Sequence, residues 1–179
     1  MYIQVNEKLK LKILRPEDAG ALFELTDHNR DFLRQWLPWL DANKSEADSL
    51  NFILGTMKQF GENQGVQMGI WDSNQLAGIV GHHKISWVNK STSLGYWLGK
   101  SFSGKGIMTS ACKALIDFSF NDLKLNCIEV AVATENKKSR AIPERLGFSL
   151  DGVLRQREWL YDKFVDHAVY SMLSSDWKS

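Results

Sequence analysis

Two glycines separated by one lysine, Gly104-Lys105-Gly106, are the residues whose type and spacing first point to chemistry. They stand between an apolar run, LGYWLG, and a segment with helical periodicity. A glycine turn between a strand and a helix lets backbone N–H groups and the positive end of the helix dipole approach a phosphate, because no Cβ stands in the way. The alternative is an ordinary connection without a ligand, which the local sequence taken alone favours.

Two better-known phosphate motifs do not fit this turn. A Rossmann fingerprint needs a third glycine at 109, where Thr109 stands, and the chain has no repeated βαβ units. Gly99-Lys100-Ser101 matches the end of a Walker loop, but the earlier glycine would fall at 94, which is Leu94. What remains is a strand, a Gly-x-Gly turn and a helix.

The cysteines and the two adjacent histidines predict neither covalent catalysis nor a metal site. Cys112 falls in the middle of a predicted helix and Cys127 in a predicted strand, with no base at a motif spacing, so we expect packing roles and no covalent catalysis. His82 and His83 are adjacent in one predicted strand and point to opposite faces, so no metal site is predicted. Two cysteines without paired spacing also favour a reducing, cytoplasmic setting.

The elements around the glycine turn predict an α+β fold. Helical signals predict helices that open at Arg15-Pro16, follow Ser45, span 104–120 and end at Leu146-Gly147. The helix after Ser45 should bury an apolar face made of Ala47, Leu50, Ile53, Leu54 and Met57. Alternating or continuous apolar runs predict strands over 2–5, 9–14, 66–72, 75–87, 91–99, 125–133, 148–160 and 164–174.

Length and charge bound the class of protein. At 179 residues the chain fits one domain, predicted over 1–179, with a net charge of +1. That charge gives no strong field toward nucleic acid or an anionic membrane. No segment approaches the ~20 apolar residues of a membrane span, and the strand-like N-terminus is not typical of a signal peptide. We therefore expect no nucleic-acid partner and no membrane partner.

The order of these elements, with Asn136-Lys137-Lys138-Ser139 and a helix ending in Leu-Gly-Phe, resembles the GNAT superfamily of acetyl-CoA-dependent N-acetyltransferases. The run SRAIPERLGF from 139 to 148 and the later DGVLRQREWLYDKFVDHAVYSML are similar to the RimJ/RimL branch, which acetylates the N-termini of ribosomal proteins. The resemblance extends from the first strand to Leu173. It implies a mixed, mostly antiparallel central sheet flanked by helices.

The resemblance implies acetyl-CoA as co-substrate. The superfamily signature Gln/Arg-x-x-Gly-x-Gly/Ala falls on 101–106, where Gly104 and Gly106 match, Ser101 replaces the usual Gln or Arg, and Ser103 replaces a frequent aromatic residue. The strand before the turn would splay from strand 125–133, and the pantetheine arm would pair with the freed backbone. The implied cofactor-binding residues are Tyr96, Trp97, Leu98, Gly99, Ser103, Gly104, Lys105, Gly106, Ile107, Met108, Asn136 and Ser139.

The resemblance also implies two catalytic residues. Glu158 would be the general base for the amine, although a surface carboxylate paired with Arg155 or Arg157 is an equal alternative. Ser139 would donate a proton to the CoA thiolate, and it could also cap the helix 140–146. A free α-amine has a pKa near ~7.7–8.0 and lysine near ~10.4, so a protein N-terminus is the easier acceptor. Acetylation of a polyamine or antibiotic, and a CoA-binding sensor without turnover, are the alternatives.

Three further residues complete the predictions. Trp36 and Trp39, on either side of Pro38, could wall an acceptor pocket or belong to the core. Pro143 lacks an N–H and predicts a kink or a short first turn in its helix. By analogy with the family, a homo-oligomer, either a dimer or larger, is implied.

Overall fold

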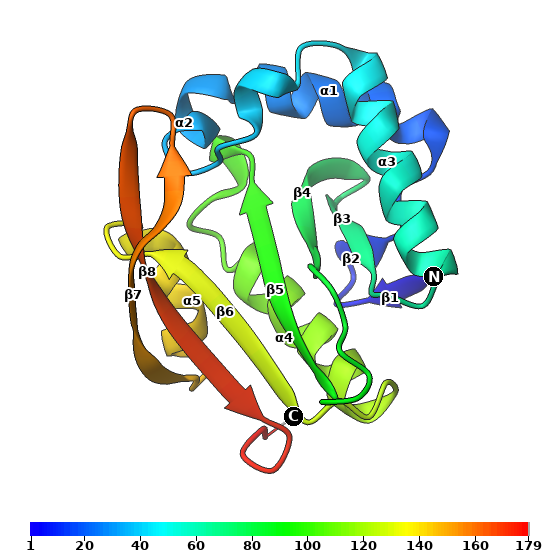
Figure 1. The fold of residues 1–179 in the computed structure, drawn as a ribbon. Helices are drawn as coiled ribbons and strands as arrows, with labels where there is room; N and C mark the ends of the chain where they lie inside the picture. Colours follow the sequence, from blue (N-terminus) through cyan, green and yellow to red (C-terminus); the bar gives the residue numbers. More distant parts are fainter. Residues whose placement is uncertain (179) are drawn as a thin grey trace.

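One mixed sheet of eight strands organises the computed structural model, which describes residues 1–178 (Figure 1). The spatial order of the strands is β1-β2-β3-β4-β5-β6-β8-β7. Every neighbouring pair is antiparallel except β5 with β6, which is parallel. The strands are β1 Tyr2–Gln4, β2 Leu9–Lys12, β3 Gln67–Asp72, β4 Gln75–His82, β5 Ser91–Leu98, β6 Cys127–Ala133, β7 Ser149–Leu160 and β8 Lys163–Leu173.

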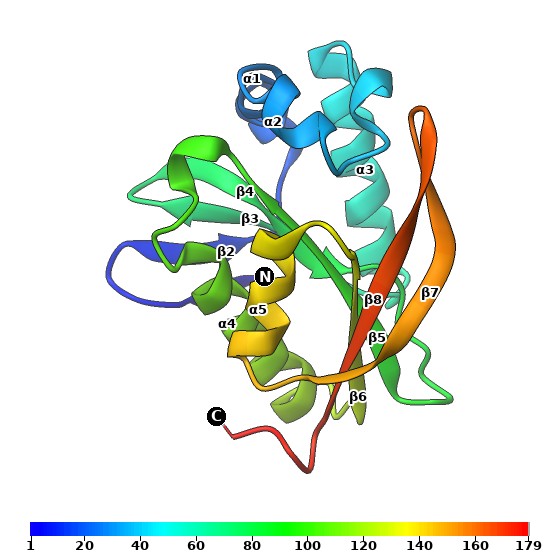
Figure 2. The ribbon, with the colours of Figure 1, turned by 90° about the vertical axis from the view of Figure 1, so that its left-hand side faces the viewer.

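Helices cover both faces of this sheet. Val80 and Ile79 are neighbours in β4 and therefore face opposite sides; Val80 joins the larger apolar cluster with α4, and Ile79 joins a second cluster with α1 and α3. Figure 2 shows α4 and α5 on one side of the sheet and α3 on the other. The helices are α1 Ala19–Asp27, α2 Arg30–Arg34, α3 Glu46–Gly61, α4 Ile107–Asn121 and α5 Lys137–Arg145, with 3-10 turns η1 Pro16–Asp18, η2 Leu40–Ala42 and η3 Lys100–Phe102.

The predicted α+β architecture is confirmed; every strand boundary except the end of β4 lies within two residues of the prediction, and the larger differences are the start of α4 and the end of β4. Helix α4 begins at Ile107 instead of 104, because Gly104 and Gly106 have φ of +78° and +75°, which is left-handed and not helical. Strand β4 ends at His82 instead of 87, and residues 83–90 form an irregular return closed by a bridge between Ser86 and Ser91.

The predicted apolar face of α3 is partly wrong. The helix starts where Ser45 predicted, and the Asp48 carboxylate accepts from the Ser45 hydroxyl at 2.8 Å. However, the buried residues are Ser49, Ile53 and Thr56, whereas Leu54 and Met57 are exposed. Helix α3 packs mainly against α1. Ile53 packs in the apolar cluster with Ala19 and Leu22 of α1, while Leu54 and Met57 stay on the outside.

The parallel strands β5 and β6 pair only at their beginnings. Ser91–Ser93 pair with Cys127–Glu129, after which the strands diverge (Figure 1). β5 remains paired with β4 through Leu98, and β6 remains paired with β8 through Ala133. We call the stretch where 94–98 and 130–133 no longer pair the β5–β6 split. The predicted splaying of this strand is therefore confirmed.

No helix within residues 1–178 has both the length and the apolar character needed to cross a membrane. The prediction of one domain over 1–179 stays a prediction, which the continuity of the sheet supports.

Candidate active site

Backbone groups of β5 face the split at every second residue. The N–H of His83 donates to Ser93 O at 2.9 Å, and the N–H of Gly99 donates to Ala77 O at 2.8 Å, so the odd-numbered residues of β5 bond to β4. Because the direction alternates along a strand, the N–H and C=O of Tyr96 and Leu98 point toward β6 across the split. The predicted cofactor-binding run thus divides: Tyr96 and Leu98 present free backbone groups, whereas Trp97 and Gly99 do not.

The glycine turn ends in an open space next to the start of α4. A Cβ added at Gly104 or Gly106 would meet nothing within 4 Å. Gly106 is the N-cap of α4, no side chain caps the helix, and the first backbone bond runs from Ser110 N–H to Gly106 O at 3.0 Å. The N–H groups of Ile107 and Met108 are therefore unpaired in the described chain, at the positive end of a 15-residue helix. This arrangement fits an anion such as a diphosphate.

The remaining residues of the turn lie beside this space. Ser103 ends η3 in an extended conformation, and the Lys105 ammonium lies 5.8 Å from the centroid of the Phe102 ring. The turn is also tied to a distant helix, because Asn29 Oδ1 accepts from the Lys100 N–H at 2.8 Å. Sequence reasoning missed Asn29: it lies 71 positions from Lys100, and no local motif marks it.

Helix α5 faces the split from the β6 side. Asn136 is its N-cap, and Asn136 Oδ1 accepts from the Ser139 N–H at 3.2 Å. The alternative that Ser139 itself caps the helix is therefore wrong. The Ser139 hydroxyl makes no hydrogen bond within the described chain, and the Ser139 carbonyl accepts from the Tyr96 phenol at 2.9 Å. The structure thus brings together Tyr96, Asn136 and Ser139, as predicted for the cofactor site.

Glu158 contacts a histidine and neither of the neighbouring arginines. Glu158 Oε2 lies 3.4 Å from His167 Nε2, and the two side chains are 31% and 13% exposed. The alternative that Glu158 pairs with Arg155 or Arg157 is wrong. The Glu158 carboxylate is thus partly open to solvent.

A bulge in β7 sets this pair of side chains. Glu158 pairs with Val165 and Leu154 with His167, so residues 155–157 face only Asp166. Val165 and His167 lie two residues apart on β8 and share a face, and the bulge brings Glu158 into register with Val165, next to His167. His167 pairs with Ala133, the last residue of β6, and lies at the wide end of the split. Sequence reasoning missed His167 because its place follows from the β6–β8 register and not from a motif.

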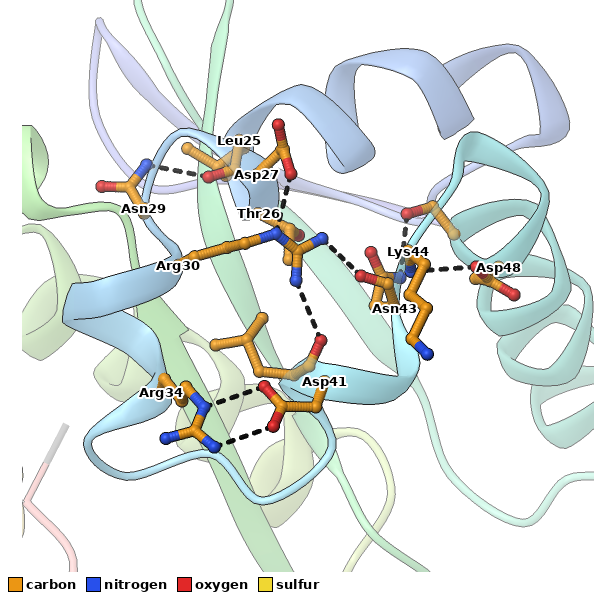
Figure 3. A network of polar contacts seen from close by, with 12 residues as sticks. Leu25, Thr26, Asp27, Asn29, Arg30, Arg34, Asp41, Asn43, Lys44 and Asp48 are labelled. Carbon is orange, nitrogen blue, oxygen red and sulfur yellow. Dashed lines mark hydrogen bonds and ion pairs between the residues drawn. The ribbon is translucent and has the colours of Figure 1, made fainter. Parts of the chain in front are cut away.

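The segment that carries the two tryptophans is fixed by polar contacts. Arg30 reaches Asp27 at 2.7 Å and the Leu40 carbonyl at 3.1 Å, while Arg34 binds both oxygens of Asp41 at 2.9 and 2.8 Å (Figure 3). These contacts hold α2 and η2 in one arrangement.

The two predicted substrate residues lie at different depths in this segment. Trp36 is half-buried, and Trp39 is 39% exposed with its ring centroid 6.0 Å from that of Trp97. Trp39 therefore lies near Trp97, in the part of β5 that no longer pairs with β6. A wall for an acceptor stays a prediction for both tryptophans.

The tip of the β7–β8 hairpin docks on the same segment. The Tyr161 hydroxyl donates to Leu37 O at 2.5 Å, and the Arg34 guanidinium lies 3.7 Å from the centroid of the Tyr161 ring. A cavity of ≈ 350 Å³ opens here, lined by Arg34, Gln35 and the hairpin residues 160–163. The hairpin therefore joins the Glu158 strand to the tryptophan segment.

His82 and Cys112 are buried structural residues, whereas Cys127 is only partly buried. Burial, and then the neighbouring His83, lower the pKa of His82 to about 4, and His82 Nε2 lies 2.8 Å from Ser119 Oγ. Burial raises the pKa of the Cys112 thiol well above its usual range, which agrees with a packing role. Within residues 1–178 no group of three or more His, Cys, Asp or Glu side chains is arranged to hold a metal ion.

Comparison with known proteins places these features in a family. Residues 8–149 match the family model described as "Acetyltransferase (GNAT) domain". The chain is 36% identical over 177 residues to the "Putative ribosomal N-acetyltransferase YdaF" of Bacillus subtilis (strain 168), covering 98% of this chain and 96% of that protein.

Two solved structures share the fold closely. The microcin C7 self-immunity acetyltransferase MccE, in complex with acetyl-CoA and AMP, is 31% identical with a TM-score of 0.91, covering 96% of this chain and 95% of that one. RimL, the ribosomal L7/L12 alpha-N-protein acetyltransferase, in complex with coenzyme A, is 26% identical with a TM-score of 0.94, covering 97% and 98%. The predicted fold and the predicted RimJ/RimL resemblance are confirmed.

Proposed function

This chain belongs to the GNAT acetyltransferase family and is an N-acetyltransferase; we propose that it moves the acetyl group of acetyl-CoA directly to the α-amine of a protein N-terminus, in particular that of a ribosomal protein. The observation that carries the proposal is the β5–β6 split, where free backbone groups of β5 lie beside an uncapped helix N-terminus. No covalent enzyme intermediate is part of the proposal.

The residues of the split fit coenzyme A. The N–H and C=O of Tyr96 and Leu98 offer a strand edge to the two amides of pantetheine. The N–H groups of Ile107 and Met108 would hold the diphosphate above Gly106, where the absence of a Cβ leaves room. The Asn136 carboxamide, with its oxygen committed to the Ser139 N–H, keeps its NH₂ for the pantetheine arm.

The chemistry divides among three groups of the chain. When bound, acetyl-CoA supplies the acetyl group as a thioester. Glu158 takes a proton from the incoming ammonium, directly or through one water, and His167 holds that carboxylate. The Ser139 hydroxyl donates its proton toward the departing sulfur, and the free N–H groups of β5 stabilise the negative charge that develops on the carbonyl oxygen.

A protein α-amine is the acceptor we favour, on two grounds. Its pKa near ~7.7–8.0 leaves a substantial neutral fraction at pH 7, so a carboxylate at the mouth of the split is a sufficient base. In addition, the names of YdaF and RimL assign those relatives to ribosomal proteins, and for RimL to the L7/L12 α-amine.

One mixing experiment tests the proposal. Acetyl-CoA is mixed with the protein and a panel of amines, and free thiol release is followed. We expect turnover with N-terminal peptides of ribosomal proteins and little with spermidine or aminoglycosides. Turnover with small amines alone would replace this acceptor class by the small-molecule alternative, and saturable binding without thiol release would indicate a sensor.

A further inference from the structure

The carbonyl of Ser139 lacks the usual i+4 partner in its own helix. In an α-helix the C=O of residue i accepts from the N–H of residue i+4. Four residues after Ser139 stands Pro143, which lies inside α5 and has no N–H. The turn before it closes normally, with Arg140 N–H donating to Asn136 O at 3.0 Å. A carbonyl left open in a partly buried place is costly, so another donor is needed.

Tyr96 supplies that donor from across the split. Its phenol donates to the Ser139 carbonyl at 2.9 Å, and its ring packs against the larger apolar cluster. Burial, and then the neighbouring Cys112, raise the pKa of Tyr96 well above its usual range, so the phenol keeps its proton at neutral pH. The same residue therefore faces the split with its backbone and reaches α5 with its side chain.

The other polar ties of α5 do not reach β5. Arg140 donates to Thr134 O at 3.0 Å and to the Tyr170 hydroxyl at 2.8 Å, which joins α5 to the β6–β8 side. Arg145 donates to Thr109 Oγ1 at 2.8 Å, which joins α5 to α4. Within residues 1–178, the Tyr96 hydrogen bond is thus the one from β5 to α5, and it spans the two sides between which the ligand must fit.

We propose that Tyr96 is a positioning residue of the acetyl-transfer site: held by the carbonyl that Pro143 leaves open, it fixes the Ser139 hydroxyl and the Asn136 carboxamide at a set distance from the free edge of β5. The inference rests on the proposed function, because it concerns how coenzyme A meets both sides of the split. A site whose two sides are already fixed loses less conformational entropy on binding, and it keeps the proton donor in line with the reacting atoms.

The test pairs Tyr96→Phe with Pro143→Ala. Tyr96→Phe removes the hydrogen bond and keeps the ring. The free energy of unfolding should fall, and the Ser139 hydroxyl and Asn136 carboxamide should be held less firmly. Pro143→Ala returns an N–H to residue 143, which gives the Ser139 carbonyl a helical partner without restoring any tie to β5. The double variant therefore distinguishes two roles of Tyr96: a hydrogen-bond donor to the Ser139 carbonyl, and a residue that positions α5 against β5.

Four proteins are compared: the wild type, each single variant and the double variant. Urea unfolding gives their stability, calorimetry gives the Kd for coenzyme A, and thiol release gives kcat. In Tyr96→Phe we expect a loss of stability, a Kd raised about fivefold and kcat lowered about tenfold or more. In the double variant stability returns to the wild-type value, while Kd and kcat stay impaired.

Two results would overturn the inference. One is a double variant that regains wild-type Kd and kcat together with its stability, which would reduce Tyr96 to a donor for a carbonyl. The other is a Tyr96→Phe variant that binds and turns over like the wild type. Wild-type protein without saturable coenzyme A binding would instead overturn the proposed function, and this inference with it, so the two failures are distinguishable.

Discussion

At the scale of single residues, the proposed chemistry depends on side chains and backbone groups that have few other partners. The Glu158 carboxylate has one polar contact, with His167, and the Ser139 hydroxyl has no hydrogen bond within the described chain. Gly104 and Gly106 leave open space where other residues would place a Cβ. The Glu158 and Ser139 side chains, which have few polar partners, can be changed without a large loss of stability, so their roles can be tested by substitution.

The first residue-scale prediction concerns Glu158. Glu158→Gln keeps the size of the side chain but cannot take a proton, so kcat should fall on the order of 10²-fold, the lower end for loss of a general base. Coenzyme A affinity, measured by calorimetry, should stay within about twofold of the wild type, because the change is one of base and not of cofactor binding. Glu24→Gln, at an exposed carboxylate on α1, is the control. Wild-type turnover in Glu158→Gln would remove Glu158 from the base role.

The second residue-scale prediction compares two glycines that both have a left-handed backbone conformation. Gly106 has φ +75° and Gly147 has φ +80°, and a Cβ at Gly147 meets only Met172 at 3.9 Å. Both Gly→Ala changes should lower the free energy of unfolding by about 1–2 kcal/mol, the cost of a left-handed Cβ. Only Gly106→Ala should also weaken coenzyme A binding, by about tenfold or more, because its Cβ enters the space for the diphosphate. Equal affinities of the two variants for coenzyme A would refute the placement of the diphosphate at Gly106.

At the scale of elements, three segments far apart in the sequence meet around the split. The tryptophan segment, the β5 edge with its glycine turn, and the β7–β8 hairpin are joined by long-range hydrogen bonds, of which Asn29 to Lys100 and Tyr161 to Leu37 are two. These hydrogen bonds hold the tryptophan segment and the hairpin, which we propose to bind the acceptor, next to the β5 edge, which we propose to bind the cofactor.

The hairpin contact gives an element-scale prediction. Tyr161→Phe removes the hydrogen bond to Leu37 O and keeps the ring against Arg34. The tip should move relative to α2, and KM for an acceptor peptide should rise by about three- to tenfold, in the range of a lost interface hydrogen bond. The Kd for coenzyme A should not change, since Tyr161, Leu37 and Arg34 are not among the residues proposed to bind the cofactor. Tyr2→Phe, at an exposed tyrosine of β1, is the control. An unchanged KM would show that the docked tip plays no part in acceptor binding.

The sequence predicted the type and order of the eight strands and of the four longer helices because their signals are local, whereas the short helix α2 was not predicted. Glycine at the end of α5 and Ser45 before α3 mark boundaries by backbone preference alone, and both were found correctly. By contrast, the partner of Glu158 and the donor to the Ser139 carbonyl depend on strand register and on contacts between distant segments. Pro143 did signal a broken helical bond, but only the fold shows that Tyr96 fills it.

At the scale of the whole molecule, a buried histidine links stability to pH. The N–H of Val66 donates to His82 Nδ1 at 3.4 Å, and His82 Nε2 contacts Ser119, whose hydroxyl donates to Leu115 O. This chain of bonds requires neutral His82, and burial accordingly lowers its pKa from 6.5 to about 4. Burial lowers the pKa of the adjacent His83 as well.

The sign of the pH effect follows from these pKa values. Below pH 6.5 the unfolded chain binds a proton at His82, whereas the folded chain does so only near pH 4. The contribution of His82 to stability is therefore complete above pH 6.5 and falls as the pH drops toward 4, by on the order of 3 kcal/mol. The free energy of unfolding, measured with urea at each pH over this range, should depend less steeply on pH in His82→Gln than in the wild type. His28→Gln, at an exposed histidine, should keep the wild-type slope; parallel slopes for all three proteins would contradict the assignment.

The β5–β6 split as the cofactor site is tested most directly by residue-resolved amide hydrogen exchange with and without coenzyme A. Bound coenzyme A should slow exchange at the amides of Tyr96 and Leu98 and of residues 104–108. Gly95 and Trp97, already bonded to β4, should change little, which gives an alternating pattern along one strand. Uniform protection along β5, or none there despite saturation with coenzyme A, would contradict the account.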